Sequence, residues 1–210
     1  MENDLIVVID QETREKLENF NKYYRLQSEI NANLNSNVFL GDRENRKCRF
    51  CGKTKPEVKF KQDAHVIPQS IGNRYLLSFF ECDNCNHFFG STYEDSFANF
   101  FSDSRAFANV KNQNSGKTPK HKENKTGFEI MHTGKSVEIY FGESHPEVLK
   151  LDPEKKELIL TVTLPSHIPI HVFKAMVKMA MCLIEESEIE QFGNCFKWLL
   201  DTTKDELFKE

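Results

Sequence analysis

Two cysteine pairs have the residue type and the spacing that chemistry at a metal requires. Cys48 and Cys51 form one Cys-x-x-Cys pair, and Cys82 and Cys85 form a second. Two residues between cysteines allow a tight turn to present both sulfurs to one ion, and two such turns supply the four thiolates of a closed tetrahedral zinc site. The thirty residues between the pairs exceed the usual short insert of a zinc ribbon. We therefore expect a folded element inside the metal clip.

The segment between the two pairs carries a histidine, and an asparagine follows the last cysteine. The segment contains the run Asp63-Ala64-His65-Val66-Ile67-Pro68, and Asn86 comes directly after the second pair. A neutral imidazole, whose unperturbed pKa is about 6.5, can accept a proton from water at cellular pH. The amide oxygen of an asparagine is a hard ligand suited to magnesium or manganese. A base and a metal ligand are thus available close to the cysteines.

This order of motifs resembles the HNH endonuclease family in its four-cysteine form. The resemblance covers about a quarter of the chain and rests on Cys-x-x-Cys, then Ala-His-Val-Ile-Pro-x-Ser-x-Gly, then Cys-x-x-Cys-Asn. It implies a ββα-metal module, in which a short β-hairpin and a helix hold one divalent ion against a scissile phosphate and a histidine activates water. It also implies structural zinc on the cysteines, catalytic magnesium or manganese, and DNA as the substrate.

Individual roles follow from the resemblance residue by residue. It implies that His65 is the general base and that Asn86 is a ligand of the catalytic ion. The chain departs from the family at Ala64, where an aspartate or histidine commonly binds the ion as well. We expect Asp63 to substitute, because residues 63 and 65 of an extended strand project from the same face. The family's middle asparagine has no clear equivalent, and Asn73 is the nearest candidate.

Two functions of different classes remain open. The first is a metal-dependent HNH-type endonuclease that hydrolyses DNA phosphodiester bonds, which the resemblance places in restriction, mobile elements or phage defence, often inside a larger complex. Because no specificity domain is recognisable, we expect nonspecific cutting controlled by a regulatory partner protein or by homo-oligomerisation. The second is a catalytically inactive, zinc-stabilised module that binds nucleic acid or protein, and Ala64 is the best argument for it.

Charge is distributed unevenly along the chain. The net charge of −4 offers no overall attraction to nucleic acid. Residues 42–61 are nevertheless rich in lysine and arginine, as are residues 111–125, whereas the last thirty residues are acidic. We expect the nucleic-acid contacts in the first run, on Arg43, Arg46, Arg49 and Lys53. A solvated charged face is the alternative for each run taken alone.

The composition favours a cytoplasmic protein without a membrane span. No run approaches the roughly 18 apolar residues of a membrane helix. The apolar run at residues 5–9 is too short for a signal peptide and follows acidic residues. Cys182 and Cys195, the two cysteines outside the pairs, lie within apolar helical patterns. We expect both to be reduced core thiols.

The periodicity predicts an α+β fold, in which a ββα-metal module is joined by an N-terminal helix, a small antiparallel sheet and C-terminal helices. The two short strands of the module, or their loop, are expected within residues 58–67. Helices are expected over residues 11–33, from residue 83, from Pro169 and near the end of the chain, and strands at 5–9, 127–131, 137–141 and 158–164. Residues 112–124 indicate an exposed loop, either a mobile arm that closes on nucleic acid or a segment without function.

These elements suggest four parts. Residues 1–40 form an N-terminal strand and helix extension, 41–110 the zinc-containing nuclease module, 111–126 a basic loop, and 127–210 a small sheet with a helical C-terminal region. Two sets of apolar positions follow helical spacing, and they predict a core face for the first set and either core packing or a dimer interface for the second. The first is Phe89, Tyr93, Phe97, Phe100, Phe101 and Phe107, and the second is Phe173, Met176, Val177, Ala180, Leu183 and Ile184.

Overall fold

The structure is a computed structural model, and it describes residues 10–24, 30, 36–112, 116–142 and 148–205. The chain divides into two units, Met1–Ala32 and Asn33–Glu210, and each is described by itself. The strand predicted at residues 5–9 lies outside the described residues. None of the helices in the described ranges combines the length and the hydrophobicity that a membrane crossing requires.

The first unit contains one described helix, α1 (Gln11–Tyr23). It begins at Asp10, because the carboxylate of that residue accepts a hydrogen bond of 2.8 Å from the backbone nitrogen of Thr13 and so caps the helix. The helix ends at Tyr23, well before the predicted end at residue 33, and residues 25–29 and 31–35 lie outside the described part. No residue of α1 is buried, so its apolar side is exposed within this unit.

The second unit begins with a short mixed sheet. Its strands are β1 (Val38–Leu40), β2 (Ala64–His65) and β3 (Leu76–Ser78), in the order β1-β3-β2. β1 runs parallel to β3, and β2 runs antiparallel to β3. The helix α2 (Asp83–Phe89) follows. β2, β3 and α2 together form the strand, strand and helix of a ββα unit.

The second strand of this unit lies later in the chain than the sequence pattern predicts. Only β2 falls within residues 58–67, so placing both strands there was wrong. The connection between the strands contains a short 3₁₀ helix, η1 (Gln69–Ile71), and a turn at Gly72, whose φ of +98° favours glycine. Because this connection occupies the residues after β2, the second strand begins only at Leu76.

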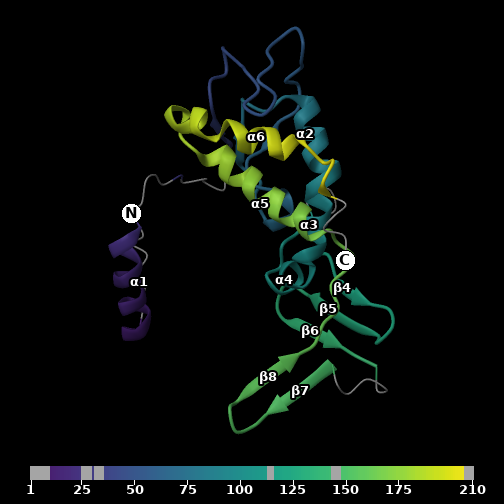
Figure 1. Cartoon of the computed structure of the whole chain (residues 1–210). Helices are drawn as coiled ribbons and strands as arrows, with labels where there is room; N and C mark the ends of the chain where they lie inside the picture. The colour runs from purple at the N-terminus through teal and green to yellow at the C-terminus, as the bar shows by residue number, and fades with distance from the viewer. Residues whose placement is uncertain (1–9, 25–29, 31–35, 113–115, 143–147, 206–210) are drawn as a thin grey trace. The chain divides into compact units, whose positions relative to one another are not determined.

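Helices that precede the middle strands in the sequence pack against helices that follow them. α2 continues as a π-helical stretch, η2 (Gly90–Glu94), then α3 (Asp95–Phe100) and α4 (Ser102–Phe107). Much later come α5 (Pro169–Leu183), the 3₁₀ stretch η4 (Glu186–Phe192) and α6 (Gly193–Leu200). α5 contacts η2, α3 and α6 (Figure 1). The predicted helix start at Pro169 is confirmed.

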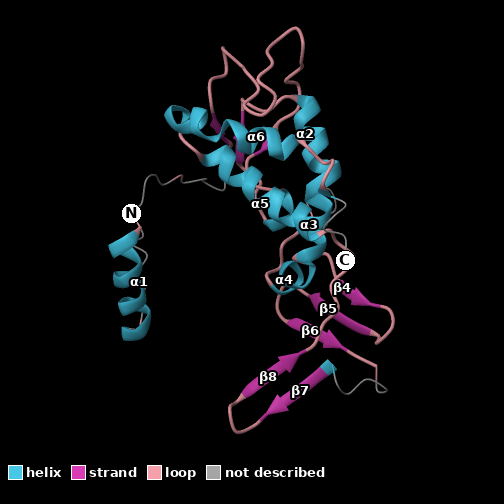
Figure 2. Cartoon of the chain, viewed as in Figure 1, coloured by secondary structure: helices cyan, strands magenta, loops and turns pink. Residues whose placement is uncertain are grey.

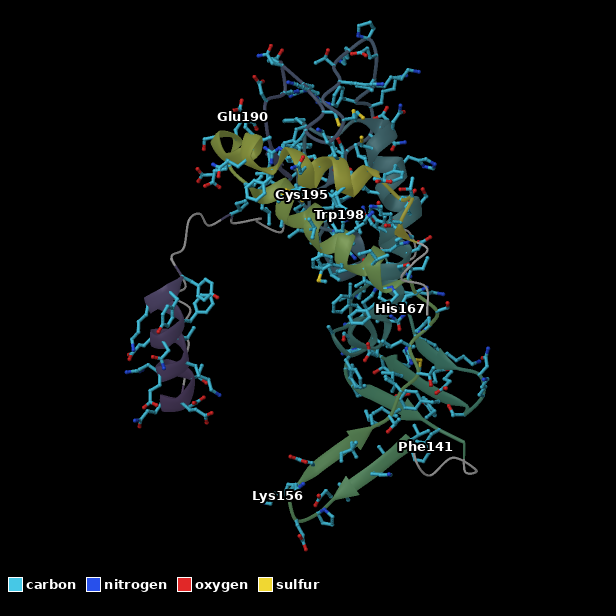
Figure 3. All side chains as sticks on the ribbon, viewed as in Figure 1. Phe141, Lys156, His167, Glu190, Cys195 and Trp198 are labelled. Atoms are coloured by element: carbon cyan, nitrogen blue, oxygen red, sulfur yellow. The ribbon has the colours of Figure 1, made fainter. Side chains whose placement is uncertain are left out.

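The middle of the chain forms antiparallel strands, as predicted (Figure 2). β4 (His121–Glu123), β5 (Phe128–His132) and β6 (Val137–Tyr140) make one sheet, and β7 (Leu149–Asp152) pairs with β8 (Glu157–Leu160) in a hairpin. Figure 3 labels Lys156 at the turn of this hairpin. The strand predicted to reach residue 164 ends at Leu160.

The segment predicted as a basic loop is only partly a loop. Residues 121–123 form β4, and residues 113–115 lie outside the described part. His121 is 1% exposed and its ring lies beside that of Phe128, with 5.9 Å between the ring centroids. Burial of this imidazole explains why the end of a polar, lysine-rich segment is held in a sheet.

Two separate clusters of buried apolar residues form the core. The larger cluster joins the cysteine region, the first sheet, α2, η2, α3, α5 and α6. The smaller one consists of Ala106, Phe128, Ile130 and Val148. Among the aromatic residues predicted to be core, Phe89, Tyr93 and Phe97 are buried, whereas Phe100 and Phe107 are more than one-third exposed.

The buried face of α5 is not the predicted one. Phe173, Met176 and Leu183 are 52%, 42% and 43% exposed, so these residues do not pack in the core of this chain, and the predicted alternative of a dimer interface stays a prediction. The buried residues of the helix are instead Val172, Lys174, Ala175, Lys178, Met181 and Cys182. Lys174 and Lys178 on this face pair with buried carboxylates. A hydrophobic pattern places lysine in solvent, so it cannot identify this face of the helix as the buried one. Cys182 is buried and Cys195 is half-buried, and both are free thiols.

Candidate metal centre and nuclease site

The four paired cysteines converge on one point. The Sγ atoms of Cys48, Cys51, Cys82 and Cys85 all lie within 4.8 Å of one another, and none forms a disulfide. The Sγ atoms of Cys51 and Cys82 are 3.8 Å apart. Four sulfurs placed about 2.3 Å from a central zinc at tetrahedral angles are about 3.8 Å from each other. The cluster is therefore positioned to bind a metal, and its size and all-thiol chemistry fit zinc.

Short turns position the two pairs. In the first, the backbone nitrogen of Gly52 donates to the carbonyl of Cys48 over 2.8 Å, and Gly52 has a φ of +72°. In the second, Cys82 is the N-cap of α2 and Cys85 lies in its first turn. Burial raises the pKa of the Cys82 thiol to about 11. A bound cation is what would allow such a buried thiol to ionise.

His65 lies on β2 with its imidazole on the half-exposed side of the strand. Its neighbours Ala64 and Val66 are fully buried and point into the core. The Nε2 atom of His65 makes a short contact with Nε2 of Gln69, on η1, and its Nδ1 atom is buried without a hydrogen-bond partner among the described residues. Burial, together with the charge of Lys178, lowers the pKa of His65, and Asp63 opposes this shift. The imidazole is therefore neutral at pH 7.

Asp63 and Asn86, the two proposed ligands of a catalytic ion, both lie close to the segment that leads into β2. Asp63 immediately precedes β2 and is exposed. Asn86, on α2, donates a hydrogen bond of 3.1 Å from Nδ2 to Oε1 of Gln62, the neighbour of Asp63. Because a cation would be bound by the amide oxygen of Asn86, this bond to its nitrogen is compatible with a ligand role. Both side chains thus lie near the start of the His65 strand.

Asp83 fixes this arrangement and was not singled out in the sequence. Its Oδ1 atom accepts hydrogen bonds from the backbone nitrogens of Lys61 and Gln62, at 2.8 and 3.0 Å. Its own nitrogen donates to the carbonyl of Lys59 over 2.9 Å. The first turn of α2 is therefore clamped to the segment that enters β2. An aspartate directly after a cysteine ligand, at a helix start, was the available signal.

Asn73 organises the connection between β2 and β3. Its Nδ2 atom donates to the carbonyls of Ile67 and Leu76, at 2.7 and 2.9 Å, and its Oδ1 accepts from the nitrogens of Tyr75 and Leu76. All of these bonds go to backbone groups within the hairpin connection. Asn73 therefore shapes the hairpin that carries His65.

A buried ion pair between Lys178 and Glu81 contacts the backbone of β2. Lys178, on α5, lies 3.0 Å from Oε2 of Glu81, and the two side chains are 3% and 0% exposed. Lys178 also donates to the backbone carbonyl of His65 over 2.9 Å. Burial raises the pKa of Glu81 to about 7, and the ammonium of Lys178 opposes that rise. Sequence periodicity missed both residues, because charged side chains rarely occupy core positions.

Arg49 has a structural role that replaces the predicted contact with nucleic acid. Its guanidinium is 6% exposed and donates to the carbonyls that end α5, those of Met181, Cys182 and Ile184, each at 3.1 Å. It also lies over the ring of Phe80, 3.9 Å from the ring centroid. A cation that satisfies the free carbonyls of a helix end is well placed there. Arg49 is therefore corrected from a candidate DNA contact to a link between the first cysteine pair and α5.

The remaining candidates for DNA contacts differ in exposure. Arg43 and Lys53 are exposed, and Arg46 is half-buried. Arg46 donates to the carbonyl of Phe60 over 3.0 Å and lies over the ring of Phe79. A shallow depression of about 460 Å³ next to the first cysteine pair is lined by Arg43, Glu44, Asn45, Arg46, Lys47, Thr54 and Lys55. Its lining is mostly basic and polar.

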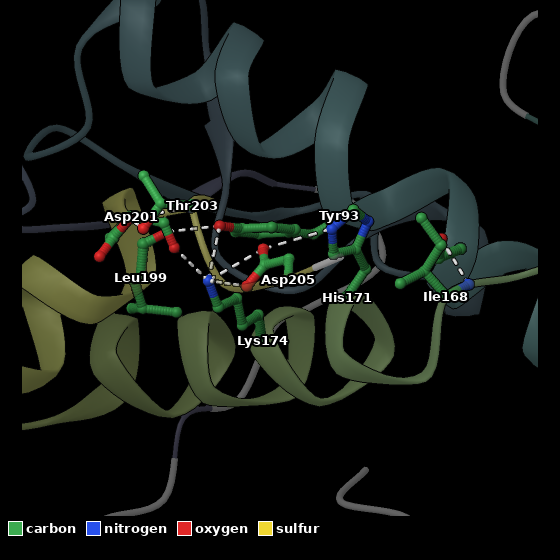
Figure 4. Close-up of polar contacts among 9 residues, drawn as sticks. Tyr93, Ile168, His171, Lys174, Leu199, Asp201, Thr203 and Asp205 are labelled. Atoms are coloured by element: carbon green, nitrogen blue, oxygen red, sulfur yellow. Dashed lines mark hydrogen bonds and ion pairs between the residues drawn. The ribbon is translucent and has the colours of Figure 1, made fainter. Parts of the chain in front are cut away.

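A second buried polar cluster lies on α5 away from His65 (Figure 4). Lys174 is fully buried and pairs with Asp205 at 2.8 Å, and it also donates to the backbone carbonyl of Asp201. His171 lies 3.3 Å from Asp205, and the hydroxyl of Tyr93 donates to the carbonyl of Leu199 over 2.6 Å. These contacts join α5 to η2 and to the segment that follows α6.

Comparison with known proteins identifies the cysteine region. Residues 48–102 match the family model described as HNH endonuclease. The matched segment contains all four cysteines, the His65 hairpin, α2, η2 and α3. This part of the chain is therefore similar to HNH endonucleases, and it has four cysteines positioned to bind a metal. No curated protein and no solved structure matches the chain.

Proposed function

We propose that this protein is a metal-dependent endonuclease that hydrolyses DNA phosphodiester bonds. The observation that carries the proposal is that His65, Asp63 and Asn86 lie around the start of one hairpin, where an imidazole and two oxygen-bearing side chains are available. His65 is placed by β2, Asp63 precedes it, and Asn86 is linked to the same segment through Gln62. This grouping lies inside the region that matches HNH endonucleases.

His65 would act as the general base. It would remove a proton from water, whose oxygen then forms a bond to phosphorus as the bond from phosphorus to the leaving 3′ oxygen breaks. A neutral imidazole is required for this step, and the lowered pKa of His65 supplies it at pH 7.

The metals would have separate roles. Zinc on the four thiolates is coordinatively full, so its role is structural. Asn86 and Asp63 would hold magnesium or manganese, which when bound supplies Lewis acidity at the phosphate. The four cysteines are the one group of three or more His, Cys, Asp or Glu ligands that converge in the described residues. A hard-ion site with so few protein ligands should release its ion readily.

A plasmid-nicking assay tests the proposal. The zinc-replete protein is incubated with supercoiled DNA and with magnesium, manganese or neither ion. We expect cleavage only with an added ion, and a fall on the order of 100- to 10,000-fold in rate for His65→Ala, the range for loss of general base catalysis. His132→Ala, at a half-buried histidine of β5, is the matched control. Cleavage at the wild-type rate by His65→Ala would remove this residue from the mechanism.

The same assay examines the two proposed ligands. Asn86→Ala should raise the magnesium concentration needed for the half-maximal rate, because one ligand is lost. Asp63→Ala should do the same if Asp63 substitutes for the family's ligand at Ala64. An unchanged metal requirement in Asp63→Ala would exclude that ligand alone.

Ala64 favours a second candidate function. Its methyl group is fully buried and faces the core, so no ligand is available at this position. If the remaining ligands cannot hold an ion, the protein is a zinc-stabilised module that binds nucleic acid or a partner protein without cutting. DNA binding without nicking at any magnesium or manganese concentration would establish this alternative.

A further inference from the structure

The residue that supports the His65 backbone comes from outside the HNH-matched region. Lys178 lies on α5, and the match ends at residue 102. Its Nζ atom donates to the carbonyl of His65 over 2.9 Å and lies 3.0 Å from Oε2 of Glu81. Because Glu81 directly precedes Cys82, this single ammonium group connects the histidine strand, the second cysteine pair and α5.

The pairing of the strands explains why His65 offers its carbonyl to Lys178. β2 is an edge strand of the sheet, with β3 as its one neighbour. The backbone nitrogen of Val66 donates to the carbonyl of Leu76, so these two residues form a hydrogen-bonded pair. Hydrogen-bonded and non-bonded pairs alternate in an antiparallel ladder, so the adjacent pair of His65 and Leu77 is non-bonded. The carbonyl of His65 therefore points away from β3, and Lys178 satisfies it.

Stability alone does not account for a lysine at this position. A buried ion pair can often be replaced by apolar residues of similar volume without loss of stability. The Nζ atom of Lys178 lies 5.7 Å from the ring centroid of Phe89, against which a methionine would pack. What a methionine cannot do is hold the His65 carbonyl. The specific contribution of Lys178 is thus to hold β2 in position through the His65 carbonyl.

We propose that Lys178 is a positioning residue for His65, so that α5 is an integral part of the nuclease site. This inference rests on the proposed function, in which His65 is the general base. β2 is only two residues long, and a strand this short is fixed by few bonds. A displacement of about 1 Å in a reacting group can reduce a rate on the order of 100-fold. The bond from Lys178 is the restraint on the side of β2 that no strand covers.

Lys178→Met and Lys174→Met form a matched pair of variants for the test. Both lysines lie on the buried face of α5, one turn apart, but Lys174 pairs with Asp205 and donates to the carbonyl of Asp201 (Figure 4). For each zinc-loaded variant, kcat and KM for plasmid cleavage with magnesium are measured, together with hydrogen exchange at the β2 amides. We expect Lys178→Met to reduce kcat on the order of 100-fold with an unchanged KM and to increase exchange at β2. Lys174→Met should change neither.

The outcomes separate this inference from the proposed function. Equal kcat values for the two variants in a cleaving wild type would overturn the role of Lys178. If the wild type does not cleave, the proposed function fails and hydrogen exchange decides: greater exchange at β2 in Lys178→Met supports the positioning role, and equal exchange overturns it. If Lys178→Met does not fold, the double variant Glu81→Gln with Lys178→Met, which leaves no unpaired charge, is judged by the same two measurements.

Discussion

The two core clusters of the second unit are built on different physical principles. The larger one contains four thiols that converge on a metal position and includes the buried pair of Glu81 and Lys178. The smaller one, beneath β5, contains only apolar residues, with the neutral ring of His121 beside Phe128. Apolar residues alone are sufficient for a small sheet. A core that also contains ionisable groups needs partners for each of them.

This difference indicates where chemistry is located. In the larger cluster, Lys178 connects its buried charge to the strand of His65, and Arg49 connects the first cysteine pair to the end of α5. Beside the smaller cluster, the buried imidazole of His121 lies 2.9 Å from the hydroxyl of Ser102, at the end of the HNH-matched region and beyond the cysteines and His65. We therefore expect perturbations of the larger cluster to affect zinc, fold and cleavage together, and perturbations of the smaller one to remain local.

The largest effect is expected from Cys82→Ser. Structural zinc contributes about 10–16 kcal/mol in zinc-finger peptides, which equals or exceeds the total stability of about 5–15 kcal/mol of a typical domain. The larger cluster should therefore lose zinc and cooperative unfolding, while the amides of β5 keep their protection from hydrogen exchange. Elemental analysis and hydrogen exchange measure the two effects. Cys195→Ser, at a half-buried thiol outside the cluster, is the control and should cost about 1 kcal/mol. A variant that retains zinc and fold would contradict the structural role.

A smaller effect is expected from pH, and in the β4 and β5 sheet it is assigned to His121. Burial lowers the pKa of His121 from its usual 6.5, against the opposing charges of Asp103 and Glu123. Below pH 6.5 the unfolded chain therefore binds a proton that the folded sheet does not, so stability falls as the pH drops from 6.5 towards the lowered pKa. Protection factors of the β4 and β5 amides should decrease over this range.

His121→Gln checks the assignment of this pH dependence. Glutamine stays neutral and can replace the hydrogen bond between Nδ1 of His121 and the hydroxyl of Ser102, which is 2.9 Å long. The decrease in protection below pH 6.5 should disappear in this variant and persist in His132→Gln. Persistence in both variants would assign the titration to another group.

Local sequence constraints predicted much of the fold. The spacing within Cys-x-x-Cys dictates a turn, so the metal clip could be predicted from four residues. Pro169 favours a first helical turn, and α5 begins there. Alternating residues predicted β5 and β6 within a residue of their observed bounds. Each of these signals acts over a few neighbouring residues, which is the range that periodicity can detect.

Contacts over a long sequence separation were not predictable in this way. Lys178 and His65 are 113 residues apart, and only the folded chain shows that a lysine on α5 meets an edge-strand carbonyl. The apolar residues Phe173 and Met176 suggested the opposite face of the helix, because hydrophobicity was the only available criterion. Arg49 was misassigned for the same reason, since a basic run gives no information about which member caps a helix. The residues whose roles could not be predicted from the sequence are thus charged residues, such as Lys178 and Arg49, whose partners are distant in sequence.

The smallest effect on stability, with a clear effect on binding, is expected from charge reversal at the surface. Arg43→Glu with Lys53→Glu changes two exposed residues on either side of the first cysteine pair, and Lys122→Glu with Lys125→Glu changes two exposed residues near β4. Anisotropy of a labelled duplex, measured with His65→Ala protein at increasing salt, gives the slope of log affinity against log salt. If each residue of the first pair contacts one phosphate, that slope should fall by about 1.8 and affinity should decrease for all sequences. The second pair should leave the slope unchanged. A reduced slope for the second pair instead would place the DNA on the sheet and contradict the contrast between the two regions.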